Sequence, residues 1–249
     1  LIEFVMIVFM LFAVVNFATH FLAWRGRSLG VYLRDAEAVA SLGLILASCV
    51  GIAAFLWWQN IYPGFWMSLR HASFNLVSIA TSSGYASVDY AQWPMFAPLW
   101  MMFLTAIAAS SGSTGGGIKM IRTLVLVKQA GREFVKLLHP AAINPMKIGG
   151  HVIANNIVFA VLGFIFLYFM SIMTLTFLLL ISGMDFISAF TAVLASINNC
   201  GPGLGTVGPA SNYSGLTDFQ TWVCTFAMLI GRLEIFTVLI LFTPHFWRR

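Results

Sequence analysis

Charged residues are scarce in this sequence. Asp, Glu, Lys and Arg together make up 8% of its 249 residues, whereas soluble domains carry about 25%. So few charges cannot give a domain of this length a water-soluble surface, which excludes an ordinary soluble protein. Since hydrophobic residues make up 60% of the chain, the composition predicts a protein that crosses a membrane several times.

Cysteine is also rare. Cys49, Cys200 and Cys224 lie far apart and inside apolar segments, a spacing that fits neither a disulfide framework nor a cysteine metal site. We interpret Cys49 and Cys224 as small packing residues. Cys200 lies in a loop, where its backbone carbonyl is expected to matter more than its thiol.

A signal peptide is not visible, and the sequence begins at Leu1 without an initiator Met. We therefore expect a fragment of a longer protein. Judged against the ~20 residues needed to cross a bilayer, apolar runs long enough to span are predicted near 1–23, 38–61, 93–109, 118–138, 152–182 and 219–243.

Positive charge is concentrated at the ends of apolar runs, and the net charge is +5. The basic stretches lie at 25–34, 128–147 and 248–249. The loops on the opposite side carry Asp89, Asp185 and Asp218. Because Lys and Arg are enriched in cytoplasmic loops, we predict that the basic stretches are cytoplasmic. Their place at membrane boundaries favours this reading over nucleic-acid binding, so no nucleic-acid partner is expected.

The sequence contains an internal repeat. Gly84 and Gly201 lie 117 positions apart, each in a short loop that follows a short apolar segment, and the flanking apolar segments align at the same offset. Each copy consists of an apolar helix, a short apolar helix, a loop that contains the glycine, and a second apolar helix. This order is that of the membrane–pore–membrane unit of potassium channels, in which backbone carbonyls replace the water around an ion.

The repeat predicts an all-α polytopic membrane protein, built from repeated helix–pore helix–filter loop–helix units around a pore. The expected parts are a last helix of a preceding unit at 1–24, a cytoplasmic connector at 25–37, a complete unit at 38–138 with its inner helix broken at 110–117, a connector at 139–149, and a second complete unit at 150–249. Half-length helices are predicted at 65–79 and 184–197, and the last inner helix at 217–243.

The two loops that contain Gly84 and Gly201 are the candidate ion filter. Irregular backbone at membrane depth survives only where protein or water surrounds it, and carbonyls suit a monovalent cation better than Ca²⁺, which prefers carboxylates. Two chance re-entrant turns are the alternative, which the shared spacing disfavours. The predicted filter residues are Thr81, Ser82, Ser83, Gly84, Asn198, Asn199, Cys200 and Gly201.

A glycine-rich stretch at 110–117 interrupts the inner helix of the first complete unit. Glycines are costly inside a helix, and Arg232 aligns near this stretch at the same offset. An arginine at membrane depth indicates function, and its predicted partners are the carbonyls and hydroxyls of the stretch. We interpret the set as a gate; a buried Arg232–Glu234 pair that only packs is the alternative. The gate residues are Ser110, Ser111, Gly112, Ser113, Thr114, Gly115, Gly116, Gly117, Lys119 and Arg232.

Four motifs carry a family resemblance. They are Ser113–Lys119, Asn199–Gly205, Gly231–Thr237 and Pro244–Arg248. Together they resemble the Trk/Ktr/HKT superfamily of potassium transporters over essentially the whole chain.

The resemblance implies potassium uptake across the bacterial inner membrane through four membrane–pore–membrane units, of which this chain holds the end of the second and all of the third and fourth. It implies that Gly84 and Gly201 are filter glycines, that 110–117 is an intramembrane gating loop and that Arg232 contacts it. The implied partners are a second copy in a homodimer, membrane lipid, and a cytosolic nucleotide-binding regulatory subunit of the TrkA type. K⁺ is the implied ion, and no organic cofactor is expected in this chain.

Other functions fit the sequence less well. A Na⁺/K⁺ or H⁺/K⁺ coupled secondary transporter also uses broken helices, but its repeats are normally inverted, whereas these are parallel. An intramembrane serine protease at Ser113 needs a histidine at the same depth. A phosphate-binding loop at 112–119 needs a lysine followed by Ser or Thr, and Met120 follows Lys119. No enzymatic activity is expected.

Overall fold

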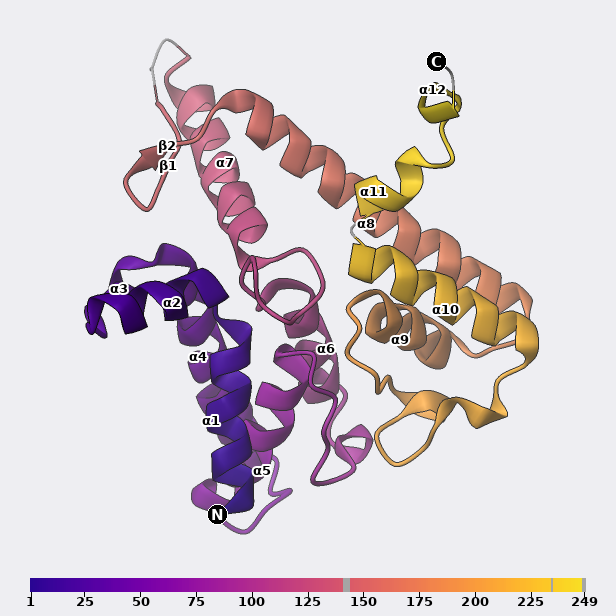
Figure 1. Cartoon of the computed structure of the whole chain (residues 1–249). Coiled ribbons are helices and arrows are strands. Elements are labelled where there is room, and N and C mark those ends of the chain that lie inside the picture. The colour runs from indigo at the N-terminus through magenta and orange to yellow at the C-terminus, as the bar shows by residue number, and fades with distance from the viewer. Residues whose placement is uncertain (141–143, 234, 248–249) are drawn as a thin grey trace.

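The computed structural model describes residues 1–140, 144–233 and 235–247. The chain is predominantly helical, as the sequence predicts, and its longer helices form two groups that meet where α6 faces α9 (Figure 1). A bent N-terminal segment packs against the first group through α1 and α5.

The first group contains α4 (Ala36–Trp58), α5 (Phe65–Ala80), α6 (Phe96–Ile107) and α7 (Met120–Leu138), with a 3₁₀ turn at Tyr90–Gln92. α4 begins after Asp35, whose carboxylate accepts hydrogen bonds from the N–H groups of Glu37 and Ala38 at 2.9 and 3.3 Å. An aspartate at this position pairs donors that the first helical turn leaves free. α5, the short apolar helix of this group, packs against α4.

The second group contains α8 (Asn155–Ile181), α9 (Phe186–Ile197), α10 (Asp218–Leu233), α11 (Ile235–Ile240) and α12 (Pro244–Trp247), with 3₁₀ turns at Gly205–Val207 and Tyr213–Gly215. α9 begins after Asp185, whose carboxylate accepts from the N–H of Ser188 at 3.0 Å. This bond holds the pKa of the Asp185 carboxyl below its usual value. The short helix of the second group is thus fixed at its N-terminal end by a charged cap.

The long helices α4 and α8 end in the same way. Asn60 and Gly183 adopt the left-handed conformation, with φ of 54° and 89°. The next N–H donates back across the turn in both cases, from Ile61 to Leu56 at 3.1 Å and from Met184 to Leu179 at 3.3 Å. This closure pairs carbonyls at the helix end and turns the chain toward the short helix that follows.

The N-terminal segment corrects one prediction. The expected single helix at 1–24 is two helices, α1 (Ile2–Val14) and α2 (Phe17–Gly26), which meet at an angle of 98°. Asn16 separates them, because its side chain accepts from the N–H of Ala18 at 2.8 Å and caps α2. The connector expected at 25–37 contains a further helix, α3 (Gly30–Arg34).

Among the described residues, α4 and α8 are long and apolar enough to cross a membrane, and the bent pair α1–α2 passes the same test if taken as one span. The run at 118–138 was wrongly counted as a span, because α7 carries basic residues throughout its length. Within the range predicted for the last inner helix, 217–243, the structure describes α10 as far as Leu233 and α11 from Ile235 to Ile240. A small antiparallel hairpin, β1 (Lys147–Ile148) and β2 (His151–Val152), departs from the all-α prediction.

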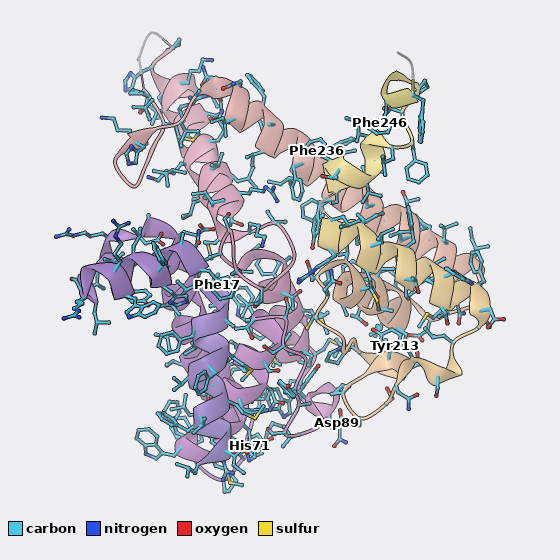
Figure 2. The ribbon with its side chains drawn as sticks, in the orientation of Figure 1. Phe17, His71, Asp89, Tyr213, Phe236 and Phe246 are labelled. Carbon is cyan, nitrogen blue, oxygen red and sulfur yellow. The ribbon has the colours of Figure 1, made fainter. Side chains whose placement is uncertain are left out.

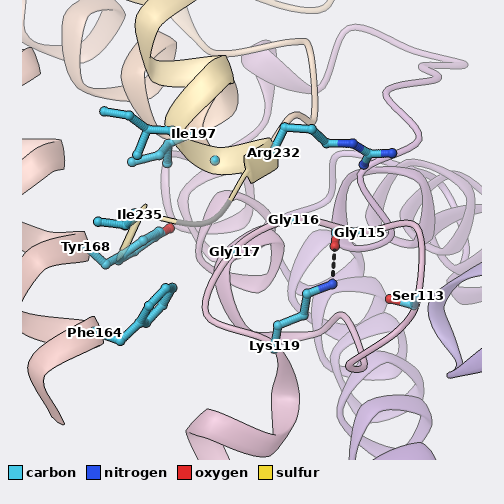
Figure 3. A pocket seen from close by; sticks show the side chains of 12 residues that line it. Ser113, Gly115, Gly116, Gly117, Lys119, Phe164, Tyr168, Ile197, Arg232 and Ile235 are labelled. Atoms are coloured by element: carbon cyan, nitrogen blue, oxygen red, sulfur yellow. Dashed lines mark hydrogen bonds between the residues drawn. The ribbon is translucent and has the colours of Figure 1, made fainter. Parts of the chain in front are cut away.

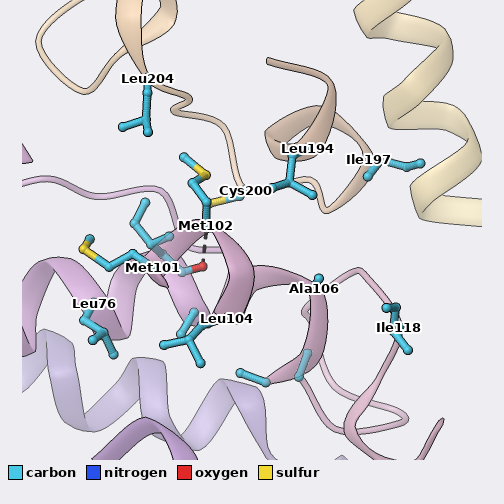
Figure 4. Packing of buried hydrophobic residues seen from close by; sticks show 14 of the residues in the cluster. Leu76, Met101, Met102, Leu104, Ala106, Ile118, Leu194, Ile197, Cys200 and Leu204 are labelled. Atoms are coloured by element: carbon cyan, nitrogen blue, oxygen red, sulfur yellow. Dashed lines mark hydrogen bonds between the residues drawn. The ribbon is translucent and has the colours of Figure 1, made fainter. Parts of the chain in front are cut away.

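The main apolar core joins the two groups. Buried side chains of α6 and α9 belong to one cluster there, with Met102 and Ala106 on the side of α6 that faces Leu194 (Figure 4). The outer faces are apolar as well, as the outward side chains in Figure 2 illustrate. On α8, Phe159, Phe166 and Phe177 are exposed by 72%, 64% and 61%. Monomeric soluble proteins rarely expose large continuous apolar surfaces, so these exposed phenylalanines fit a lipid environment.

Candidate ion pathway

The first candidate filter loop begins where α5 ends. Ser82 and Gly84 adopt positive φ, 56° and 76°. The N–H of Ser83 donates to the carbonyl of Ser78 at 2.8 Å, and the hydroxyls of Thr81 and Ser83 lie 2.9 Å apart. These short-range bonds hold the loop in one conformation.

The second candidate filter loop follows α9 and has the same local backbone. Asn199 and Gly201, each 117 positions beyond Ser82 and Gly84, have φ of 52° and 102°. The N–H of Cys200 donates to the carbonyl of Ala195 at 2.9 Å, which is the equivalent of the bond made by Ser83. The two loops therefore share both positive-φ positions and the bond that closes the preceding helix.

The two loops are in contact with each other. A Cβ atom placed on Gly84 would lie 2.5 Å from the backbone oxygen of Cys200, so only glycine fits at this position. The thiol of Cys200 is 3.6 Å from the carbonyl oxygen of Ile79 and is buried (Figure 4). The structure thus brings residues 81–84 and 198–201 together.

Asn198 is a buried connection behind the second loop. Its side chain accepts from the hydroxyl of Tyr168 at 2.9 Å and donates to the hydroxyl of Thr105 at 2.8 Å. The amide therefore joins α8, α6 and the end of α9. The polar atoms of the Asn198 side chain are used inside the protein, which leaves its backbone carbonyl as the group that could face an ion.

Tyr213 is a residue that the sequence reading did not place at the site. Its hydroxyl donates to the carbonyl of Gly201 at 2.8 Å. This bond fixes the orientation of the Gly201 carbonyl in the second candidate filter loop. The sequence offers only a weak signal, an aromatic residue twelve positions after a loop glycine.

The glycine-rich stretch forms a loop between Ile107, the end of α6, and Met120, the start of α7. It lies against the end of α9. A Cβ atom on Gly116 would lie 2.6 Å from the backbone oxygen of Asn198, and one on Gly117 would lie 2.6 Å from that of Ala106. Glycine is required at these positions because backbone approaches backbone. We call residues 108–119 the glycine loop.

Two basic side chains hold the glycine loop (Figure 3). The guanidinium of Arg232 donates to the carbonyl of Thr114 at 3.1 Å, which confirms the predicted contact between Arg232 and this stretch. The ammonium of Lys119 donates to the carbonyl of Gly115 at 2.9 Å. A cavity of about 190 Å³ lies beside both, between the loop and α8 and α10. Glu234, the alternative partner of Arg232, is outside the described residues.

The junction of α1 and α2 also binds the glycine loop. The N–H groups of Ser110 and Thr114 donate to the carbonyls of Val14 and Ala13 at 3.1 and 3.4 Å. In return, the N–H of Phe17 donates to the carbonyl of Gly112 at 3.2 Å. The bend in the N-terminal segment therefore frees backbone groups that the loop uses.

Ser111 and Ser113 have structural partners as well. The Ser113 hydroxyl donates to the carbonyl of Ser110 at 2.6 Å, so it serves the turn of the loop. The N–H of Ser111 donates to the carboxylate of Glu37 at 2.6 Å.

Glu37 is the second residue that the sequence reading missed. The same carboxylate oxygen accepts from the N–H of Ile121 at 3.0 Å, so Glu37 joins both the glycine loop and the start of α7 to the first turn of α4. It is 7% exposed. An acidic residue opening an apolar helix was the available signal, but its partners are backbone groups far along the chain.

Comparison with known proteins places the chain in a family. Residues 66–249 match the sequence model of TrkH, described as a cation transport protein. The Trk system potassium uptake proteins TrkH of Salmonella typhimurium and Escherichia coli strain K12 are 40% and 39% identical over 241 residues. Each alignment covers 97% of this chain and 50% of the relative, so the chain spans about half the length of the curated relatives it matches.

A solved structure is similar over almost the whole chain. The crystal structure of the potassium transporter TrkH from Vibrio parahaemolyticus superposes with a TM-score of 0.93 at 38% identity, covering 99% of this chain and 53% of that one. These relatives are named for transport, and the apolar helices α4 and α8 agree with an integral membrane protein. The predicted superfamily resemblance is thereby confirmed, and the chain belongs to the TrkH family of cation transport proteins.

Proposed function

We propose that this chain forms part of a potassium uptake pathway, in which residues 81–84 and 198–201 supply two sectors of an ion filter. The observation that carries the proposal is the shared backbone of the two loops, with positive φ at Ser82 and Gly84 and at Asn199 and Gly201, together with their direct contact. The remaining sectors would come from the other units that the family resemblance implies.

Carbonyl oxygens would replace the hydration shell of K⁺ in this filter. Each short helix, α5 and α9, ends at its loop, and the negative end of a helix dipole favours a cation there. The Ser82 hydroxyl is buried next to Gly115 of the glycine loop and has no hydrogen-bond partner among the described residues. It is therefore available to water or an ion in the pathway.

The glycine loop would act as the gate. It lies against the inner end of the filter candidates at Asn198, where its backbone would obstruct an ion sterically. Lys119 and Arg232 hold the loop through its carbonyls and would also repel a cation. Opening then requires the loop to leave these partners.

The partners proposed are a second copy of the protein, membrane lipid and a cytosolic nucleotide-binding subunit of the TrkA type. The relatives are named as members of a Trk system, which supports a multicomponent assembly. We assign the cytosolic contact to the basic end of α7, which projects beyond the glycine loop (Figure 1).

The test is K⁺ and Na⁺ uptake by full-length protein in cells that lack their own potassium uptake. Gly84→Ser adds a side chain against the Cys200 carbonyl, and Gly201→Ser strains a residue at φ 102°. We expect both variants to lower the K⁺/Na⁺ uptake ratio, with the larger loss at Gly84. Gly51→Ser, in open space on α4, is the matched control. Unchanged ratios in both loop variants would refute the filter assignment.

A further inference from the structure

An apolar groove of about 410 Å³ lies between α1, α4 and the segment formed by α2 and α3. Its walls include Val8, Leu11, Phe12, Leu29, Leu42 and Leu46. His20 fixes the walls relative to one another, because its ring nitrogens lie 2.7 Å from the hydroxyl of Tyr32 and 2.8 Å from the carbonyl of Phe12. The groove is thus a formed feature bordered by four helices.

The segment that borders the groove carries only positive charge. Residues 17–34 contain Arg25, Arg27 and Arg34 and neither Asp nor Glu. Large apolar side chains project from the same segment, with Trp24 exposed by 84% and Leu29 and Leu33 by 81% each. Arginines interspersed with exposed apolar side chains, on helices that turn sharply away from a span, are typical of a segment lying at an anionic membrane surface.

This segment is tied to the glycine loop. The α1–α2 junction exchanges backbone hydrogen bonds with Ser110, Gly112 and Thr114. A second connection runs through α4: the hydroxyl of Thr19 donates to the carboxylate of Asp35 at 2.6 Å, two positions before Glu37, which binds the loop and the start of α7. A displacement of α2 would therefore reach the loop by two routes.

We propose that the groove holds an acyl chain of an anionic phospholipid whose headgroup lies on Arg25, Arg27 and Arg34, and that this lipid holds the glycine loop in place. The second half of this inference rests on the proposed role of the loop as a gate. A ligand that binds one arrangement better shifts the population toward it. Anionic lipid therefore favours the loop position described above and lowers conduction in the absence of a regulatory subunit.

The lipid site is tested by binding of spin-labelled phosphatidylglycerol to the full-length protein in bilayers, with spin-labelled phosphatidylcholine as reference. Replacing the three arginines by glutamine should lower phosphatidylglycerol affinity by about fivefold for each charge removed. Leu46→Trp fills the groove and should lower it as well. Arg70→Gln removes an arginine that pairs with Glu3 and is not among the walls of the groove; as the control it should leave the phosphatidylglycerol affinity unchanged.

The coupling is tested by K⁺ flux into liposomes without the regulatory subunit. Anionic lipid attracts K⁺ to the surface for every variant alike, so the informative quantity is the ratio of variant flux to parent flux in each lipid. We expect the arginine variant to conduct severalfold faster than the parent in phosphatidylglycerol liposomes and at the same rate in phosphatidylcholine liposomes.

Three results would overturn the inference in whole or in part. A parent protein without preference for phosphatidylglycerol, or an arginine variant that keeps the preference, removes the lipid site. Weaker lipid binding with an unchanged flux ratio removes the coupling. If no variant and no parent conducts K⁺ in any lipid, the proposed function fails, while the spin-label result still decides the lipid site on its own.

Discussion

At the scale of single residues, the glycine loop and the start of α7 depend on one carboxylate. Glu37 accepts from the N–H groups of Ser111 and Ile121. Glu37→Ala leaves both part-buried donors without their acceptor, at a cost below the about 1–3 kcal/mol that a fully buried donor would pay. We expect a lower thermal unfolding temperature in detergent and faster K⁺ flux without the regulatory subunit, because the loop loses its hold on α4.

Glu37→Gln separates these effects, since its amide oxygen can still accept the loop N–H groups. It should retain most of the stability and most of the block of flux. Glu133→Ala, which removes a carboxylate that accepts from Gln129 on the exposed face of α7, is the matched control. Flux that is equally slow in Glu37→Ala and the parent would show that the carboxylate supports the fold and not the loop position.

Residues whose chemistry is unusual in a membrane were predictable from the sequence. Gly84, Gly201 and Arg232 stand out because glycine permits rare backbone angles and an arginine at membrane depth is expensive. Glu37 and Tyr213 were missed for a physical reason: each binds backbone groups, and backbone carries no side-chain signature. The partners of Glu37 lie 74 and 84 positions away in the chain, beyond the reach of local pattern.

At the scale of elements, hydropathy predicted the long helices better than the broken ones. α4 and α8 are uniformly apolar and were located within a few residues. The run at 1–23 is equally apolar, yet it bends by 98°, because the glycine loop supplies partners for the backbone groups that the bend leaves free. Composition indicates how favourably a segment transfers into lipid, but it does not show where backbone groups find hydrogen-bond partners. The bend depends on such partners in a distant loop, so it could not be predicted.

The glycine loop itself provides the prediction at this scale. Arg232→Ala removes the bond to the Thr114 carbonyl, and deleting part of Gly112–Gly117 shortens the segment beneath the filter candidates. We expect faster K⁺ flux into liposomes from both variants without a regulatory subunit, with the larger increase for the deletion. Arg232→Lys, which keeps the charge but not the planar fork, should give an intermediate flux.

Arg70→Ala serves as the control for loss of an arginine, because Arg70 pairs with Glu3 away from the loop at 2.6 Å. Each variant must first run as a folded oligomer of parental size. If folded Arg232→Ala and the deletion conduct no faster than the parent, the loop is a structural bend in the inner helix and not a gate.

At the scale of the whole molecule, α7 is the direct route from the basic face to the glycine loop. Its first residue, Met120, donates from its N–H to the carbonyl of Ala109 at 2.6 Å, and Glu37 holds the next residue. Farther along, Lys128 donates to the carbonyl of Lys147, and Arg132 donates to Asn155 at 2.9 Å. A force applied to this end of α7 would act on the loop through a single helix.

The basic end of α7 is the proposed docking face for the regulatory subunit, which would move the helix on binding. Reversing the charge at Lys128 and Arg132, both on the basic end of α7, should weaken co-purification with a TrkA-type subunit, and the effect should shrink as salt screens the charges. Arg70→Glu, at the opposite end of the molecule, should leave co-purification unchanged. Arg248 and Arg249, which lie outside the described residues, are removed in a separate variant. Binding that survives both the reversal and the truncation places the docking face elsewhere, and α7 would then transmit no signal from the subunit.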